Sequence, residues 1–316
     1  MPESTSKVAI IGAGSVGATI AYACLIRGVG KRISIYDLNA SKVKSELLDL
    51  NHGLQFVPMA TVDGSDDIAV CEGADVVVVT AGAKQNPGQT RLDLTSDNVR
   101  ICREMLPKIQ KVAPDAVFLM VTNPVDVLTY VAQKITVLPP GRVIGSGTVL
   151  DSSRFRYLIA RHLDVAVQSV HAYIAGEHGD SEVPLWSSAT IANIPLRGLK
   201  IRGHQTLTRV DEDKIFHDVR TAAAQVIAGK GATNYAIGLA TAKILEALLH
   251  DENRVLPVSS LIHNFHGISD VCMSLPSIVS SGGVESVLDV QVDDVERAAL
   301  TKSAGVIRET IRNAGF

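Results

Sequence analysis

Three side chains in two short segments have the residue types needed for proton transfer beside a bound anion. Asp151 and Arg154 are three residues apart in a predicted helix, so they project from one face of it. Arg154 can bind a carboxylate with two hydrogen bonds. His178 lies between glycines in GEHGD, directly after a predicted strand. If Asp151 reaches His178, the pair predicts an acid/base centre that works near neutral pH.

A further cation lies in a Gly/Pro-rich segment, AGAKQNPGQTRLDL, at residues 81–94. The segment follows a predicted strand, so it predicts a loop at the edge of the sheet where ligands bind in parallel folds. Closure of such a loop would exclude water and bring Arg91 toward a developing negative charge. Taken singly, a solvated loop arginine and a surface or packing histidine are the simpler interpretations, and only the set favours catalysis.

The start of the chain predicts a nucleotide site. KVAIIGAGSVG places Gly12, Gly14 and Gly17 in a GxGxxG spacing between a strand and a helix, where the helix N-terminus can face a pyrophosphate. Asp37 ends the next predicted strand, where a carboxylate can bind a ribose diol and repel a 2′-phosphate. NAD is therefore favoured over NADP. The alternatives are a purely structural turn with Asp37 capping the next helix, or a related flavin or S-adenosylmethionine site.

Short Val/Ile-rich runs alternate with helical patterns through the first half of the chain. Strands covered on both faces and separated by helices must be parallel, so an α/β fold with a doubly wound parallel sheet is expected. A helix is expected over 94–112, with Pro107 kinking or interrupting it. The predicted strands are 7–11, 33–36, 75–80, 117–122 and one near 143.

The pattern changes after about residue 146. Helices are expected at 148–163, within 210–250 and from about 292, with strand signals at 167–175 and through 254–280. This order is typical of α+β packing. It predicts a nucleotide-binding domain at 1–145 and a substrate-binding, catalytic α+β domain at 146–316.

Composition excludes several classes of protein. The 316 residues are 46% hydrophobic with a formal net charge of −3, which is typical of a globular protein and argues against nucleic acid as the main partner. Neither an export signal nor an apolar run of the roughly 20 residues needed to span a bilayer is visible, so no membrane association is expected. The four cysteines form no CxxC pair or metal-ligand cluster. Free thiols, no bound metal and a cytoplasmic location are expected.

Together the motifs closely resemble the lactate and malate dehydrogenase family over nearly the whole chain. The resemblance implies a Rossmann-type first domain, NAD as cofactor and a role in glycolysis or fermentation. It is carried by GAGSVG at 12–17, AGAKQNPGQTRLDL at 81–94, VTNPVDVLTY at 121–130, GSGTVLDSSRFR at 145–156, GEHGDSE at 176–182 and KGATNYAIG at 230–238.

The resemblance also implies roles for individual residues. His178 is similar to the catalytic acid/base and Asp151 to its partner, while Arg154 resembles the carboxylate anchor and Arg91 the group that polarises the carbonyl. Thr233 resembles a substrate-pocket residue. The remaining cofactor or substrate contacts implied are Gly12, Gly14, Val16, Gly17, Asp37, Ala81, Gly82 and Asn123.

Gln85 occupies the position where malate dehydrogenases of this family commonly carry arginine. Pyruvate brings one carboxylate, which Arg154 can neutralise, whereas the second carboxylate of oxaloacetate would be poorly paired beside neutral Gln85. Reversible NADH-dependent reduction of pyruvate to L-lactate is therefore predicted. Gln89 stands where many relatives carry an acidic residue in this loop. Loss of that charge can alter loop closure or pH dependence, but it removes no residue with an assigned chemical role. The alternatives are a malate or broad 2-hydroxy acid dehydrogenase, and a catalytically silent NADH-binding sensor.

Two further cationic residues, Arg156 and His171, resemble the anion-binding pair of bacterial members activated by fructose 1,6-bisphosphate. Two such groups from different elements could hold a phosphate, with a second pair supplied by a symmetry-related subunit. The simpler interpretation is an exposed helix arginine and a strand histidine. The resemblance also implies a homo-oligomer, with a tetramer expected.

Overall fold

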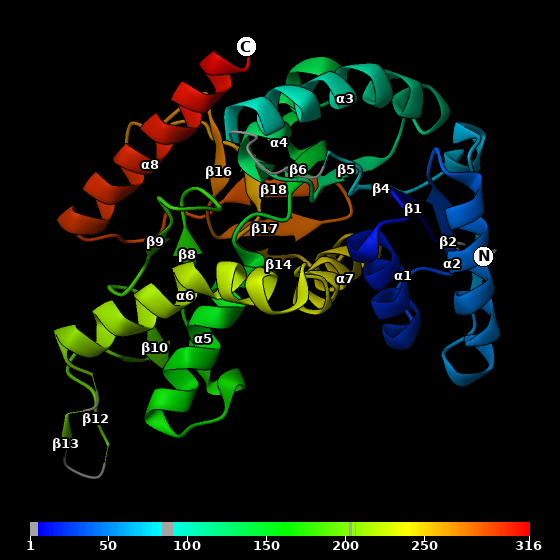
Figure 1. The fold of residues 1–316 in the computed structure, drawn as a ribbon. Coiled ribbons are helices and arrows are strands. Elements are labelled where there is room, and N and C mark those ends of the chain that lie inside the picture. The colour runs from blue at the N-terminus through cyan, green and yellow to red at the C-terminus, as the bar shows by residue number, and fades with distance from the viewer. Residues whose placement is uncertain (1–5, 84–90, 202–203, 206) are drawn as a thin grey trace.

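A mostly parallel sheet crosses the centre of the molecule in the computed structural model, which describes residues 6–83, 91–201, 204–205 and 207–316 (Figure 1). Its strand order is β16-β15-β6-β5-β4-β1-β2-β3. The strands from β1 to β6 pair in parallel. Their bounds are β1 Lys7–Ile11, β2 Arg32–Tyr36, β3 Thr61–Ser65, β4 Val76–Val79, β5 Val117–Met120 and β6 Val143–Gly145.

Helices cover both faces of this sheet, which confirms the expected doubly wound α/β fold. Every residue of β1, β4 and β5 is buried, so their side chains pack in both directions. Ile10 and Val78 pack with α1 (Ser15–Arg27), α2 (Ala40–His52) and α7 (Tyr235–Leu249). Ile11 and Val79 pack on the opposite face with α3 (Arg91–Val112), α4 (Val125–Thr136) and α8 (Asp294–Asn313).

Two local features differ from the sequence-based expectation. Strand β3 was not predicted, because TVDGS has one buried residue and forms the edge of the sheet. Helix α3 continues through Pro107, which was expected to kink or interrupt it, so the predicted interruption is wrong. Buried side chains on both sides of the proline hold the helix against the core, so tertiary packing outweighs the local backbone preference; these are Val99, Cys102, Leu106 and Ile109.

The second half of the chain extends the same sheet. Strands β15 (Ser259–Leu261) and β16 (Cys272–Ser274) form an antiparallel pair, and β15 joins β6 where Ser259 pairs with Gly145. The sheet therefore contains segments from both sides of residue 145. The sequence does not predict this pairing, because the local pattern of a short strand does not indicate which distant strand it pairs with.

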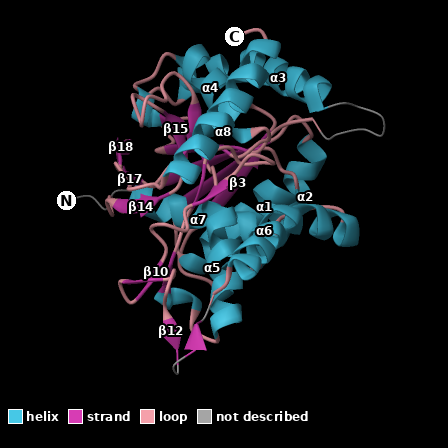
Figure 2. Ribbon diagram, turned by 90° about the vertical axis from the view of Figure 1, so that its left-hand side faces the viewer, coloured by secondary structure: helices cyan, strands magenta, loops and turns pink. Residues whose placement is uncertain are grey.

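The rest of the second half packs at one end of the molecule. Helices α5 (Val149–Leu163) and α6 (Arg209–Lys230) lie together there, away from α3 and α4 (Figure 2). Their shared core contains Phe155 and Trp186, whose rings meet edge to face at 4.6 Å. The remaining strands are β7 Val170–His171, β8 Ile174–Ala175, β9 Val183–Pro184, β10 Thr190–Ile191, β11 Ile194–Pro195, β12 Lys200–Ile201, β13 His204–Gln205, β14 Arg254–Leu256, β17 Ser277–Ser280 and β18 Gly283–Val287.

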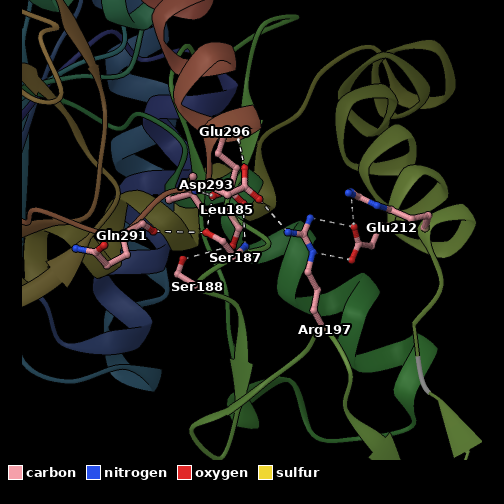
Figure 3. Close-up of polar contacts among 9 residues, drawn as sticks. Leu185, Ser187, Ser188, Arg197, Glu212, Gln291, Asp293 and Glu296 are labelled. Carbon is pink, nitrogen blue, oxygen red and sulfur yellow. Dashed lines mark hydrogen bonds and ion pairs between the residues drawn. The ribbon is translucent and has the colours of Figure 1, made fainter.

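A polar cluster ties α6 to the beginning of α8 (Figure 3). Arg197 Nε is 3.2 Å from Glu212 Oε1 on α6, and Arg197 Nη1 is 3.0 Å from Asp293 Oδ2 at the N-cap of α8. Ser187 Oγ donates to Glu296 Oε2 at 2.5 Å, which fixes the preceding loop to the same helix. Glu212 and Glu296 are buried, so the cluster holds their carboxylates by paired charge and hydrogen bonds.

Among the described residues, no helix has the length and apolar character to cross a membrane. The same part of the chain contains no group of three or more His, Cys, Asp or Glu side chains arranged for a metal ion. All four cysteines are buried and free.

Candidate active site at the carboxyl edge of the sheet

The turn between β1 and α1 has the shape of a dinucleotide site. Gly12 has φ of 107°, and a Cβ there would lie 3.0 Å from the backbone nitrogen of Ala81. A Cβ on Gly17 would lie 2.0 Å from the carbonyl oxygen of Gly12. Gly14 precedes α1, and its Cβ position is open, with nothing within 4 Å. The first and third glycines therefore permit close packing, whereas the second leaves space for a phosphate group at the helix N-terminus.

Asp37 faces this turn from the end of β2. Its Oδ2 accepts a hydrogen bond from Ala13 N at 2.8 Å, and its Oδ1 accepts one from Asn39 N at 2.9 Å. The helix α2 that follows is capped by Asn39, so the predicted alternative in which Asp37 caps that helix is wrong. The carboxylate keeps lone pairs for a ribose diol, and its charge opposes a 2′-phosphate. Val16 is half-buried beside the glycines.

The ends of β4 and β5 are joined by a buried amide that we did not single out from the sequence. Asn98 of α3 accepts a hydrogen bond from Ala83 N at 2.7 Å and donates to Asn123 O at 2.8 Å. Gly82 beside it has no room for a side chain, since a Cβ would lie 2.4 Å from Thr122. Asn98 therefore sets the path of the two segments that border the nucleotide site. The sequence clue to Asn98 was its position near the start of a predicted helix that directly follows the 81–94 loop.

The structure brings the predicted Asp151, Arg154 and His178 side chains into contact. Asp151 Oδ2 lies 2.5 Å from His178 Nδ1, and Asp151 Oδ1 accepts a hydrogen bond from Arg154 Nη1 at 2.7 Å. Asp151 is 2% exposed, while the side chains of Arg154 and His178 are 18% and 25% exposed. A buried carboxylate thus orients two partly accessible groups, and Asp151 and Arg154 share a helix face as their spacing predicts.

Helix α5 is fixed against the strand that leads to His178. Ile174 N in β8 donates to Ser152 Oγ at 2.9 Å, and Thr148 Oγ1 donates to Ile174 O at 2.6 Å. All three residues are buried. Because Ser152 follows Asp151 directly, these bonds fix the separation between the carboxylate and the imidazole.

The loop that carries His178 is held from three other elements. Gly176 exchanges two backbone hydrogen bonds of 2.8 Å with Ser274 of β16. Glu177 N donates to Ser303 Oγ of α8 at 2.8 Å, and His178 N donates to Asp126 Oδ2 of α4 at 2.7 Å. Asp126 was also missed from the sequence, although it lies three residues after Asn123 in VTNPVD. Its signal was an acidic residue in the first turn of a helix that begins at a strand end.

Neighbouring charges control protonation in this group. Burial disfavours the imidazolium, but the charge of Asp151 and its hydrogen bond raise the pKa of His178 to about 9. Burial also opposes ionisation of Asp151, yet His178 and Arg154 hold the pKa of that carboxyl below its usual value. Burial, together with the charge of Asp151, raises the pKa of Glu182 to about 8. Near neutral pH the arrangement therefore presents a protonated imidazole beside an arginine.

The remaining predicted residues lie partly outside the part of the chain that the structure describes. Gln85, Gln89 and the side chain of Arg91 lie outside the described residues, although the backbone of Arg91 begins α3. Thr233 lies half-buried in the connection between α6 and α7.

Arg156 and His171, the expected anion-binding pair, lie on α5 and β7. Arg156 Nε donates to Ala172 O at 2.8 Å, and its guanidinium lies 4.8 Å from the ring centre of Tyr173. His171 is exposed. The arginine is thus held beside the strand that carries the histidine.

The segment from Asn123 to Asp126 links the two parts of the site. Asn98 bonds the backbone of Asn123 to the end of β4 beside the glycine turn, and Asp126 bonds to the backbone of His178. The glycine turn and the His178 group therefore border the same edge of the sheet. This fold and site are those of a nucleotide-dependent oxidoreductase, with an aspartate–histidine pair at the carboxyl edge of the sheet. The chain belongs to the lactate/malate dehydrogenase family: residues 6–145 match its NAD binding domain and residues 148–315 its alpha/beta C-terminal domain. NAD is the cofactor of this first domain.

Full-length relatives agree with this membership. The chain is 50% identical over 316 residues to an L-lactate dehydrogenase of Bifidobacterium animalis subsp. lactis, covering 100% of this chain and 99% of that protein. It is 45% identical to an L-lactate dehydrogenase of Acetivibrio thermocellus, covering 97% and 96%. Among solved structures, the minor L-lactate dehydrogenase of Enterococcus mundtii superposes with a TM-score of 0.94 at 38% identity, covering 98% of both chains.

Proposed function

We propose that the protein is an L-lactate dehydrogenase that reversibly reduces pyruvate to L-lactate with NADH. The observation that carries the proposal is the Asp151–His178 contact of 2.5 Å with Arg154 bonded to the same carboxylate. The group combines a proton donor and a carboxylate anchor beside a dinucleotide turn. Relatives at 50% and 45% identity over nearly the full length are L-lactate dehydrogenases, which supports the same reaction.

In this mechanism the Gly12–Gly17 turn and Asp37 would hold NADH, which would supply the hydride for the carbonyl carbon. Arg154 binds the pyruvate carboxylate, exchanging part of its contact with Asp151 for a bidentate pair. His178 donates its proton to the carbonyl oxygen, and Asp151 stabilises the imidazolium and fixes the ring. Arg91 is assigned the stabilisation of charge on that oxygen. In the reverse direction neutral His178 accepts the hydroxyl proton of lactate.

Substrate choice is assigned to Gln85. A neutral amide leaves the second carboxylate of oxaloacetate without a counter-charge in a closed site, whereas pyruvate needs only Arg154. Thr233 is assigned to the pocket wall. Replacing Gln85→Arg is expected to raise the ratio of kcat/KM for oxaloacetate to that for pyruvate, and an unchanged ratio would remove this explanation.

The first test follows NADH oxidation by the purified protein with pyruvate, oxaloacetate and a bulkier 2-oxo acid in parallel. A strong preference for pyruvate is expected. A preference for oxaloacetate would make the protein a malate dehydrogenase with the same proton relay. Binding of NADH without turnover of any of the three acids would make it a cofactor-binding sensor.

We also propose that fructose 1,6-bisphosphate activates the enzyme through Arg156 and His171, in a homo-oligomer in which two subunits contribute to one anion site. The support is the fixed position of Arg156 beside the strand that carries His171. The test compares pyruvate saturation curves with and without the effector, for the wild type and Arg156→Gln. Activation only in the wild type is expected, and no change in KM or kcat of the wild type would remove the proposal. Light scattering tests for the expected tetramer.

Two broader assignments complete the proposal. Residues 1–145 bind cofactor and 146–316 bind substrate, which agrees with the separate family matches over 6–145 and 148–315. The cytoplasm is the proposed location, because four free cysteines suit a reducing compartment.

A further inference from the structure

We propose that Asn234 is a positioning residue whose hydrogen bond to Thr19 ties the wall of the substrate pocket to the cofactor helix. The inference rests on the proposed dehydrogenase function, in which Thr233 belongs to that wall and α1 begins at the cofactor turn. Asn234 itself touches neither pyruvate nor NADH in the mechanism above. Its bond instead fixes the separation between the two parts of the site.

The bond joins two helices whose bonded residues are 215 positions apart in the chain. Asn234 Nδ2 donates to Thr19 Oγ1 at 3.1 Å, and both residues are half-buried. The connection between α6 and α7 is short, and Thr233 directly precedes the bonded residue in it. In the part of the chain that the structure describes, no other hydrogen bond joins this connection to residues 6–145. The position of Thr233 relative to α1 therefore depends on this one bond.

The other partners of the two side chains fix the direction of the bond. Lys230 Nζ donates to Asn234 Oδ1 at 2.6 Å, and an ammonium group can only donate, so the amide nitrogen is turned toward α1. The hydroxyl of Thr19 donates to Ser15 O at 2.6 Å, which leaves a lone pair of its oxygen to accept. Donor and acceptor are thus both set before the two helices meet.

The side chain of Asn234 does not serve its own helix. An asparagine at an N-cap commonly accepts a hydrogen bond from an amide of the first turn, but at the N-cap of α7 no such bond is made. The same helix face approaches Thr19 again one turn later. A Cβ on Gly238 would lie 2.7 Å from Thr19 Cγ2, so this glycine, unfavourable in a helix interior, permits the close approach of α7 to α1 (Figure 1).

This geometry makes the pocket wall depend on the cofactor helix. The N-terminus of α1 would face the pyrophosphate, so occupation of the cofactor site restricts α1. Through Thr19 and Asn234 the same restriction reaches the connection that carries Thr233. Loss of the bond is therefore expected to weaken the binding of pyruvate and to leave the chemical step intact, which raises KM at nearly constant kcat.

The test uses two substitutions that each remove the bond. Thr19→Val keeps the shape of the side chain without the acceptor, and Asn234→Ser is too short to reach α1 but can still cap α7. In each variant KM for pyruvate is expected to rise about three- to tenfold, the range for one ordinary hydrogen bond, with kcat changed by less than about twofold. The double variant should have the KM of the single variants, because both remove the same bond. Thr19→Ser keeps the acceptor and should retain the wild-type KM.

Thr221 of α6 provides the matched control. Its hydroxyl donates to His217 O at 3.0 Å and its oxygen accepts from Gln225 Nε2 at 3.1 Å, which is the same pattern of bonds within a single helix. Thr221→Val removes this pattern without separating two elements, so KM is expected to stay at the wild-type value. Equal rises of KM in Thr221→Val and Thr19→Val, additive effects in the double variant, or a fall in kcat with unchanged KM would each overturn the inference.

Hydrogen–deuterium exchange tests the inference without turnover. Addition of NADH is expected to slow exchange of the backbone amides of residues 232–235 in the wild type and in Thr19→Ser, and to slow it less in Thr19→Val. Equal protection in Thr19→Val and the wild type would show that α1 does not hold the connection. Failure of the wild type to reduce pyruvate would remove the proposed function, while the exchange measurement would still test the role of Asn234.

Discussion

Asp151 acts on His178 both through a hydrogen bond and through its charge. The 2.5 Å contact turns Nδ1 toward the carboxylate, so in the proposed reaction Nε2 is the nitrogen that faces the substrate. The carboxylate raises the pKa of the imidazole against the opposing effect of burial. The sequence identified both residues and Arg154, because Asp–x–x–Arg and GEHGD are local patterns. It missed Asp126 and Asn98, because their partners are backbone groups that only the folded chain brings close.

The pH dependence of the two reaction directions should follow from this pair. Pyruvate reduction needs the imidazolium, so kcat/KM should stay level through neutral pH and fall as pH rises through about 9, while lactate oxidation rises over the same interval. In Asp151→Asn the pH at which pyruvate reduction falls and lactate oxidation rises should be lower than in the wild type. Turnover should also fall by roughly 10²- to 10⁴-fold. Rate profiles in both directions test this. Unchanged pH midpoints of the two rate profiles in the variant would argue against coupling through Asp151.

Protein stability should also depend on this histidine. The folded-state pKa of His178 is raised above the usual 6.5, so its contribution is fully present below pH 6.5 and is lost as pH rises through about 9. Between neutral pH and about pH 10, the wild type should lose on the order of 2–3 kcal/mol more unfolding free energy than His178→Asn. Urea denaturation at several pH values measures the difference. Parallel losses in the two proteins would mean that the ion pair does not contribute to stability.

At the scale of elements, the carboxyl edges of β1, β4 and β5 form the nucleotide side of the site. Local sequence predicted these strands, because continuous Val/Ile runs indicate burial on both faces. It did not predict β3, whose residues are mostly solvated, or the uninterrupted α3. The pairing of β15 with β6 depends on contacts between residues more than a hundred positions apart, and no local pattern encodes it.

The glycine turn offers a matched pair of substitutions within one element. Gly14→Ala places a methyl group in open space, so the melting temperature should stay near the wild-type value while the affinity for NADH falls by about tenfold or more. Gly17→Ala places the methyl 2.0 Å from Gly12 O, which forces α1 away from β1. It should lower both stability and NADH binding. Calorimetric titration and thermal unfolding of the two variants distinguish these effects, and equal melting temperatures would contradict the packing argument.

At the scale of the whole molecule, the halves of the chain share one sheet, and within the second half Arg197 joins two helices that are far apart in the sequence. Its guanidinium contacts Glu212 of α6 and Asp293 at the N-cap of α8 (Figure 3). Glu212 is buried, and among the cationic side chains that the structure describes only Arg209, at 3.4 Å, still contacts its carboxylate if Arg197 is removed. Breaking a buried ion pair by removing one partner is strongly unfavourable.

Replacing Arg197→Met is therefore expected to lower the unfolding free energy by about 1–3 kcal/mol. The value is below that of a fully buried pair, because the arginine side chain is 36% exposed and partly screened by solvent. Arg100→Met, which removes exposed pairs with Asp97 and Glu104 at 3.6 and 3.7 Å, is the control and should change stability by less than about 1 kcal/mol. Denaturant melts of both variants measure this, and similar losses would show that burial of Glu212 is unimportant.

The shared sheet has a consequence for synthesis of the chain on the ribosome. Strand β6 is complete at Gly145, but its neighbour β15 begins only at Ser259. During the interval the β6 edge of the parallel sheet lacks the partner that it has in the folded protein, and open edges are templates for pairing with other chains. The first half is therefore the segment of a newly made chain that a chaperone would have to shield, until the second half emerges and closes the edge.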